Sequence, residues 1–123
     1  MAIRRFVVTP ITDTNGDATY YSPRVSGKLV SIRYVKTDYT NGVDFTITAE
    51  ATGETLWTES NVDATAQRYP RAATASTAGA ASLYAAAGTA VNDMIALGAD
   101  RVKIVVGSGG STHTGAFHIV IDG

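Results

Sequence analysis

Two histidines, His113 and His118, are the side chains in this sequence best suited to acid–base or metal chemistry. Two hydroxyls that a histidine base could activate, Ser108 and Ser111, stand near them along the chain. A nucleophilic serine is often marked by a GxSxG elbow, and none is present. Two histidines without an obvious third ligand also make a poor metal site. We therefore expect solvent-facing imidazoles, no catalytic residue, no metal and no cofactor.

Asp13, Asn15 and Asp17 have the alternating spacing of a calcium-binding loop. An EF-hand also needs glycine at its sixth position and a bidentate acid at its twelfth. Here Gly16 is fourth and Arg24 is twelfth. Because Asn-Gly is preferred where both central residues of a turn need positive φ, this segment predicts a hairpin turn instead.

Two further patterns resemble catalytic or binding motifs. Segment 107–115, GSGGSTHTG, is glycine-rich like a phosphate-binding loop, but it leads into a strand pattern and lacks the GK[ST] ending. We expect it to be a mobile hairpin tip.

Carboxylates for glycoside hydrolysis are also present, but their strand positions indicate a solvated outer face; the acids concerned are Asp44, Glu50, Glu54 and Glu59.

The composition and length exclude several further classes of protein. A chain of 123 residues suits one domain, and the absence of cysteine excludes a disulfide framework, a thiolate zinc site and a cysteine nucleophile. A net charge of −1 gives no basis for nucleic-acid binding. The apolar run after Arg5 is too short for a signal peptide, and no segment approaches the roughly 20 apolar residues of a membrane span. We expect a soluble domain that binds neither nucleic acid nor membrane.

Short segments of alternating apolar and polar residues predict the framework of this domain. In 43–50, for example, Val43, Phe45 and Ile47 fall on one face and threonines and acids on the other. Seven to eight such strands indicate a mostly β, single-domain fold, an antiparallel β-sandwich or jelly-roll-like fold, over residues 1–123. The predicted strands are 3–9, 19–21, 28–36, 43–50, 55–59, 91–97, 101–106 and 116–122.

Asn41-Gly42 separates two of these segments and predicts a hairpin with a two-residue turn. In that register Tyr34 faces Ala49 and Arg33 faces Glu50, so that apolar residues meet apolar ones and opposite charges meet. With a second tight turn at 51–54, the sequence predicts a three-stranded meander from Lys28 to Glu59.

The periodic pattern stops between about residues 60 and 90. Ten of the 19 alanines lie between Ala72 and Ala90, interspersed with Thr, Ser and Gly that weaken any helix. We interpret the stretch as a long aperiodic Ala/Thr-rich loop inserted into the β framework, a length that usually serves a purpose.

The charges are unevenly distributed along the chain. Residues 1–36 carry a net +4, residues 37–66 a net −6 and residues 67–123 a net +1. One interpretation is cross-strand pairing inside one sheet. The other is a subunit with separated signs that docks onto an asymmetric partner, where complementary charge sets the orientation.

Aromatic and arginine side chains supply candidate partner contacts, because Trp, Tyr and Arg dominate the hot spots of protein interfaces. Trp57 is one candidate, although its place on a strand suits a core residue equally well. The run QRYPR, residues 67–71 of the aperiodic stretch, supplies other candidates. The complete candidate set is Arg4, Arg5, Trp57, Arg68, Tyr69, Pro70 and Arg71.

Three segments together resemble a family of small structural proteins of tailed phages and prophages, some of which are capsid cement (decoration) proteins. They are GKLVSIRYVKTDYTNGVDFTITAEATGETLWTE, QRYPRAATAS and MIALGADRVKIVVGSGGSTHTGAFHIVIDG, and the similarity runs from about residue 24 to 123. The resemblance implies a β-rich homo-oligomer, a trimer in preference to a dimer, that binds the major capsid protein on the outside of the virion. Its assembly would take place in the host bacterial cytoplasm.

Two other roles stay open at this point. One is a head–tail connector or tail component, which would sit at a ring instead of across the shell. The other is a carbohydrate-binding β-sandwich module, for which Trp57 and Tyr20-Tyr21 supply aromatic side chains.

Overall fold

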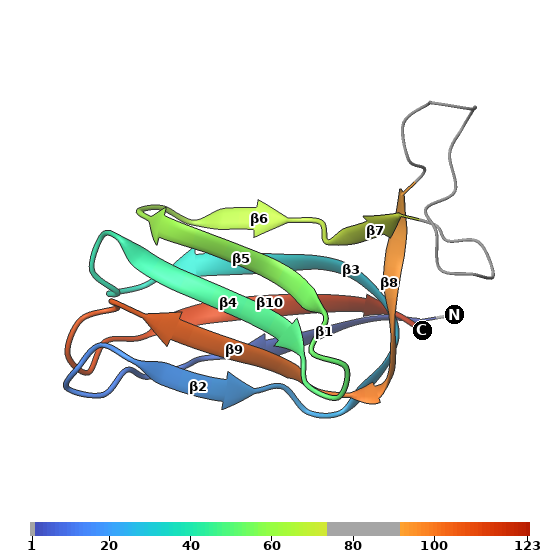
Figure 1. Cartoon of the computed structure of the whole chain (residues 1–123), viewed down its shortest axis with the longest axis horizontal. Helices are drawn as coiled ribbons and strands as arrows, with labels where there is room; N and C mark the ends of the chain where they lie inside the picture. The colour runs from blue at the N-terminus through green and yellow to red at the C-terminus, as the bar shows by residue number, and fades with distance from the viewer. Residues whose placement is uncertain (1, 74–91) are drawn as a thin grey trace.

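The computed structural model describes residues 2–73 and 92–123, and these form ten strands and no helix (Figure 1). Accordingly, no helix in the described ranges has the length and apolar character needed to cross a membrane. The strands are β1 (Ile3–Val8), β2 (Ala18–Tyr21), β3 (Val25–Lys36), β4 (Val43–Ala49), β5 (Thr55–Val62), β6 (Ala66–Arg68), β7 (Arg71–Ala73), β8 (Asn92–Asp100), β9 (Val102–Gly107) and β10 (Gly115–Asp122).

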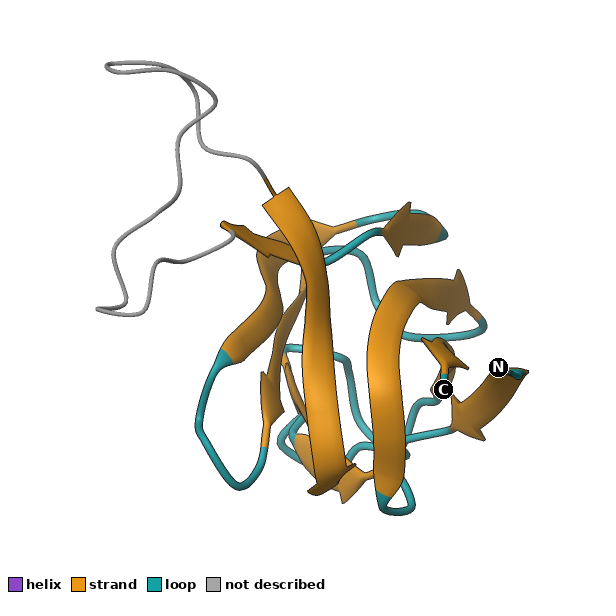
Figure 2. Cartoon of the chain, turned by 90° about the vertical axis from the view of Figure 1, so that its right-hand side faces the viewer, coloured by secondary structure: helices purple, strands orange, loops and turns teal. Residues whose placement is uncertain are grey.

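The strands form two antiparallel sheets that pack face to face, so the predicted β-sandwich is confirmed (Figure 2). One sheet has the order β1-β10-β3-β8-β7, with β6 also paired to β3; the other has the order β2-β9-β4-β5. Ile3 pairs with Asp122, Thr19 with Val105 and Leu29 with Ile95, pairs whose residue numbers add up to 124 or 125. The chain is therefore one long antiparallel ribbon that is rolled up, with β4 and β5 at its tip, which is a jelly-roll arrangement.

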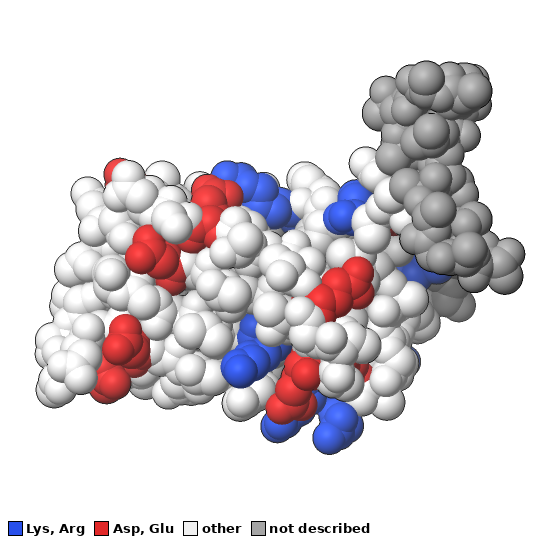
Figure 3. All heavy atoms as spheres, in the orientation of Figure 1, with Lys and Arg blue, Asp and Glu red and all other residues white. Residues whose placement is uncertain are grey.

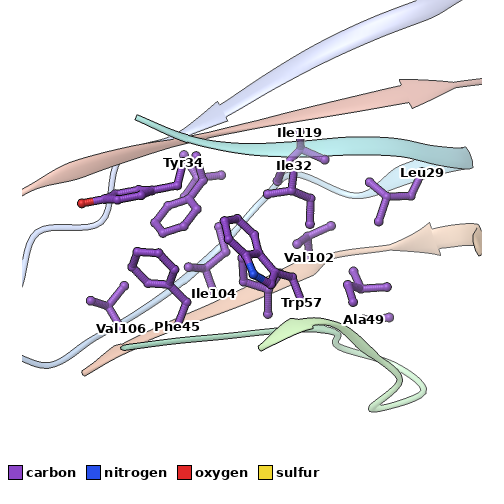
Figure 4. Packing of buried hydrophobic residues seen from close by; sticks show 14 of the residues in the cluster. Leu29, Ile32, Tyr34, Phe45, Ala49, Trp57, Val102, Ile104, Val106 and Ile119 are labelled. Atoms are coloured by element: carbon purple, nitrogen blue, oxygen red, sulfur yellow. The ribbon is translucent and has the colours of Figure 1, made fainter. Parts of the chain in front are cut away.

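The core fills the space between the two sheets, where alternate residues of each strand point inward (Figure 4). β4, β9 and β10 follow the predicted alternation, with every second residue buried. Aromatic rings join the two layers: the Phe45 ring centroid lies 4.6 Å from that of Tyr34, 4.9 Å from that of Phe117 and 5.7 Å from that of Trp57.

The predicted hairpin of β3 with β4 is wrong. β3 pairs with β10 on one side and with β6 and β8 on the other, whereas β4 pairs with β5 and β9 in the opposite sheet. The apolar faces of the two strands meet across the sandwich, as the Tyr34–Phe45 contact shows, instead of lying side by side. Alternation predicts which face is buried, but not whether two buried faces share one sheet. Of the predicted meander, the β4–β5 hairpin is confirmed.

The predicted hairpin tip at 107–115 is also wrong, because this segment links β9 in one sheet to β10 in the other. Hydrogen bonds hold it on both sides. Gly109 N donates to Gly16 O at 3.0 Å, and Thr114 N donates to an Asp38 carboxylate oxygen at 2.6 Å. The Asn15-Gly16 turn likewise leads from β1 to β2 in the other sheet, and only Gly16 of the pair has positive φ, at 84°.

Part of the predicted aperiodic stretch is regular. β5 continues to Val62, and the short strands β6 and β7 fall inside the predicted loop. Residues 74–91 of that prediction lie outside the described residues. β8 also covers residues 98–100, which separate two of the predicted strands, and Ala99 takes a φ of 48° at this irregular end of the strand.

Candidate functional site

The outer surface of the larger sheet gathers basic and apolar side chains from four strands. In β1, β10 and β3, Phe6, Ile119 and Ile32 form one cross-strand row that points into the core, so the neighbouring positions point outward. We call this surface the arginine face, and its residues are Ile3, Arg5, Val7, Ser31, Arg33, Gln67, His118 and Val120.

A hollow of about 290 Å³ opens in the arginine face. Arg5, Val120 and Ser31 form one cross-strand row, and Arg33 pairs with Gln67 in the next row but one. Val120 and Ser31 are short, so they leave the floor low between longer side chains. The β3–β10 ladder also shifts register next to Val120, and an irregularity of this kind bends the strand and increases its twist locally. All five of these residues line the hollow.

Both arginines of the hollow are held by neutral groups. Arg5 Nη1 lies 3.2 Å from His118 Nδ1. A guanidinium can only donate, so this ring nitrogen accepts and the other carries the hydrogen. Arg33 Nη1 donates to Gln67 Oε1 at 3.2 Å, and Gln67 Nε2 donates to the Tyr69 hydroxyl at 2.9 Å. These bonds orient the guanidinium groups without neutralising their charge.

Neither of these arginines forms an ion pair in the described part of the chain. The ion pairs present there join Arg68 to Glu59 and Arg101 to Glu50. Residues outside the described ranges, Met1 and 74–91, include no Asp or Glu that could supply a partner. Two uncompensated positive charges therefore flank one hollow.

Arg4 and Arg5, which the sequence placed together as contact candidates, leave β1 on opposite sides because successive strand residues alternate. Arg5 lines the hollow, whereas Arg4 pairs in register with Ile121, whose side chain is in the core. Both arginines are exposed, since β1 is an edge strand. Only Arg5 contributes to the arginine face.

Trp57 is a core residue, the second of the two interpretations of the sequence, and not a surface contact. Its exposed fraction is 6%, and its ring packs edge-on against Phe45. Its indole Nε1 donates to Glu59 Oε1 at 3.0 Å. A tryptophan in this position cannot present its ring to a partner.

Arg68 closes the edge of the sandwich between the two sheets. Its Nε and Nη2 donate to the two carboxylate oxygens of Glu59, each at 3.0 Å, and its guanidinium carbon lies 5.6 Å from the Trp57 ring centroid. Hydrogen bonds from Trp57 and then from Arg68 lower the pKa of Glu59, against an opposing effect of burial. Arg68 thus ties β6 to β5.

Of the three candidates next to Arg68, Pro70 and Arg71 make contacts within the protein, whereas Tyr69 is exposed. Pro70 is buried, and Arg71 Nη1 donates to Val30 O at 3.0 Å and to Pro70 O at 2.8 Å. Val30 lies between the parts of β3 that pair with β6 and with β8, so Arg71 occupies a gap in the ladder. Tyr69 is different, because its exposed fraction is 59% and its hydroxyl joins it to Gln67 of the arginine face.

The groups considered for catalysis are not brought together. Asp44 accepts from Asn61 N, Glu50 binds Arg101, and Glu59 binds Arg68, so the three acids belong to separate contacts. Hydrogen bonding to Arg101 lowers the pKa of Glu50. Figure 3 shows acidic side chains as separate groups on the side of β4 and β9. Within 2–73 and 92–123 no three His, Asp or Glu residues are placed to hold a metal ion.

Both imidazoles are half-buried, so the expectation that they face solvent holds only in part. His118 binds Arg5 in the arginine face. His113 Nδ1 is buried and has no hydrogen-bond partner among the described residues. The sequence interpretation also missed Ser31, Arg33 and Gln67, whose common surface depends on strand pairings that alternation alone does not reveal.

Comparisons with protein-family models, with curated proteins and with solved structures find no match to this chain.

Proposed function

We propose that this chain is a non-enzymatic virion structural protein of a tailed phage, a capsid cement protein that binds the outer surface of the major capsid protein lattice. The observation that carries the proposal is the arginine face, a rigid sheet surface with two uncompensated charges and exposed apolar side chains. Ile3 and Val7 have exposed fractions of 65% and 51%. Exposed apolar groups beside unpaired arginines are typical of protein-binding surfaces.

Four paired strands hold this surface, so little conformational entropy is lost when it docks. A cement protein also gains from repetition, because many copies that bind only the assembled shell stabilise it by mass action. Self-association, as a trimer in preference to a dimer, would multiply the contacts of each unit. The resemblance to phage structural proteins in three sequence segments supports the same role, as does the jelly roll, an architecture found among viral capsid proteins.

The proposal is tested by binding to shells. Purified protein is mixed with expanded and unexpanded capsids of the phage whose genome carries this gene, and bound protein is measured by co-sedimentation. We expect saturable binding to expanded capsids and a higher melting temperature of the decorated shell. Absence of binding to both kinds of capsid would overturn the proposal. A virion with about a dozen copies, the number of a ring, would identify a connector or tail component instead.

A carbohydrate-binding role remains the second candidate, since jelly rolls also form lectin domains. Trp57 cannot serve it, but Tyr20 and Tyr21 are exposed on the edge strand β2. The Arg101 guanidinium carbon lies 4.3 Å from the Tyr21 ring centroid and covers a face of that ring. Glycan-array binding that disappears in Tyr20→Ala would support this candidate, and an empty array would exclude it.

A further inference from the structure

We propose that the hollow between Arg5 and Arg33 is a carboxylate-binding site, and that its occupant is an acidic side chain of the protein on which the arginine face docks. That the partner is a capsid protein rests on the proposed function. That the hollow binds a carboxylate does not, because it follows from the charge and geometry of this chain alone.

The charge of the hollow calls for an anion. Arg5 and Arg33 lie on the two strands that flank β10, in rows two residues apart, so standard strand spacing and rise place their Cα atoms about 12 Å apart. Each guanidinium binds one neutral acceptor, His118 or Gln67, and neither meets a carboxylate in the described ranges. An anion between them would relieve the repulsion of two like charges and accept hydrogen bonds from both.

The donors of the hollow match a carboxylate. A guanidinium has five N–H groups in a planar fork, so each arginine keeps several donors beyond the bond it already makes. The floor adds the hydroxyl of Ser31, a residue whose exposed fraction is 5% and which lines the hollow. Two forks above a hydroxyl provide donors for both oxygens of a carboxylate.

The surroundings of the hollow favour an acid on a protein surface over a free anion or a nucleic acid. Val120 lines the hollow itself, and exposed Val7 and Ile3 lie on either side of Arg5 along β1. Apolar side chains next to a charge site suit an acidic residue with apolar neighbours. A nucleic acid would instead need a row of phosphate contacts and a basic excess, whereas this chain carries a net charge of −1.

The first experiment tests the hollow without any partner. N-acetyl-glutamate N-methylamide is titrated into the intact protein and followed by ¹H–¹⁵N NMR at the Arg5 and Arg33 Nε signals and the Ser31 amide. We expect saturable shifts with a dissociation constant of about 10 mM, the order expected from two charge-assisted hydrogen bonds. The neutral analogue N-acetyl-glutamine N-methylamide should give no saturable shift at these signals.

Variants assign the binding to the two arginines. Arg5→Gln and Arg33→Gln should each weaken binding of the glutamate probe about tenfold, the loss of one charge-assisted bond. Arg4→Gln is the matched control, because it removes the same charge one residue away on the opposite side of β1, and it should bind as the wild type does. Melting temperatures of all three variants verify that each is folded. No saturable shift in the wild type, or equal binding in Arg4→Gln and Arg5→Gln, would overturn the site.

Other anions distinguish the possible ligands. Inorganic phosphate and a short DNA duplex are titrated in parallel under the same salt conditions. Tighter binding of phosphate than of the glutamate probe would overturn the carboxylate assignment. Binding of the duplex with a steep salt dependence would show that the surface serves nucleic acid.

The second experiment repeats capsid co-sedimentation with the Arg5→Gln/Arg33→Gln double variant and the Arg4→Gln control. We expect the double variant to bind at least about a hundredfold more weakly, since two charge-assisted bonds are lost, and the control to bind normally. Normal binding by the double variant would overturn the docking role of the hollow and leave the cement proposal intact. If the wild type binds the glutamate probe but no capsid, the cement proposal is overturned and the carboxylate site in the hollow stands.

Discussion

Arginine side chains perform two different tasks in this molecule. Arg68, Arg71 and Arg101 tie elements together, through Glu59, the Val30 carbonyl and Glu50 respectively. Arg5 and Arg33 are oriented by neutral groups and keep their charge for the surface. The difference depends on what lies across from each strand position, which a sequence pattern does not show.

The Glu59 contacts predict how stability depends on pH. Because hydrogen bonds from Trp57 and Arg68 stabilise its charged form, the pKa of Glu59 in the folded protein lies below its ordinary value of 4.5. A carboxyl of this kind contributes stability above its unfolded pKa and loses that contribution as the pH falls through the folded pKa. We therefore expect urea-unfolding midpoints to fall as the pH is lowered below 4.5.

The variant Glu59→Gln identifies the source of this dependence. It should be less stable than the wild type at neutral pH and should lose less stability on acidification. Part of the acid dependence should persist, because Arg101 lowers the pKa of Glu50 in the same way. Parallel pH profiles of the two proteins would contradict the assignment to Glu59.

At the scale of elements, β3 is the strand that organises the larger sheet. It pairs with β10, β6 and β8. The strand is irregular at Gly27, where φ is 132° and the ladder to β8 shifts register. A Cβ at Gly27 would lie 2.7 Å from Asp122 O and 2.8 Å from Gly123 Cα. Glycine is required there because the backbone of β10 passes too close for any side chain.

Gly27→Ala should therefore destabilise the protein by about 2 kcal/mol or more, from backbone strain together with the contact to β10. Gly98→Ala in the partner strand β8 is the matched control, because its Cβ would meet nothing within 4 Å and its φ is not positive. The control should change the free energy of unfolding by less than about 1 kcal/mol. Equal effects in chemical denaturation would contradict this account of β3.

The pairing of β7 with β8 allows the segment between them to be replaced. Ala73 and Asn92 face each other in this ladder, so a two-residue Asn-Gly turn can join them in place of residues 74–91. We expect the shortened chain to keep its fold, with an unchanged far-UV circular dichroism spectrum for the β framework. Loss of cooperative unfolding would show that the replaced segment contributes to the core.

Predictability from sequence also differs between elements. The buried faces of β4, β9 and β10 are predictable because alternation is a property of each strand alone. The partners of β3 are not, because its apolar face packs equally well beside β4 or across from it. The arginine face depends on those partners: Arg33 meets Gln67 and His118 only because β6 and β10 flank β3. A site assembled from four strands therefore lies beyond what alternation can predict.

At the scale of the whole molecule, the rolled ribbon predicts an order of folding. The β4–β5 pairs are close in sequence, whereas Ile3 with Asp122 closes almost the whole chain. Because closing a longer loop costs more entropy, we expect β4–β5 to form early and β1–β10 late. The conservative variant Ile47→Val should slow folding, whereas Ile119→Val should mainly speed unfolding, as measured in stopped-flow chevron plots. The reverse pattern would contradict this order.

The neighbouring ends of the ribbon also have a mechanical consequence. Gly123 N donates to Ala2 O, and both ends of the chain lie at one end of the sandwich (Figure 1). A pull on the two ends would open the β1–β10 ladder one hydrogen bond at a time, which needs little force. A load applied through the arginine face is instead shared by β1, β10 and β3. Attachment by that face, and not by its ends, would let the protein carry tension.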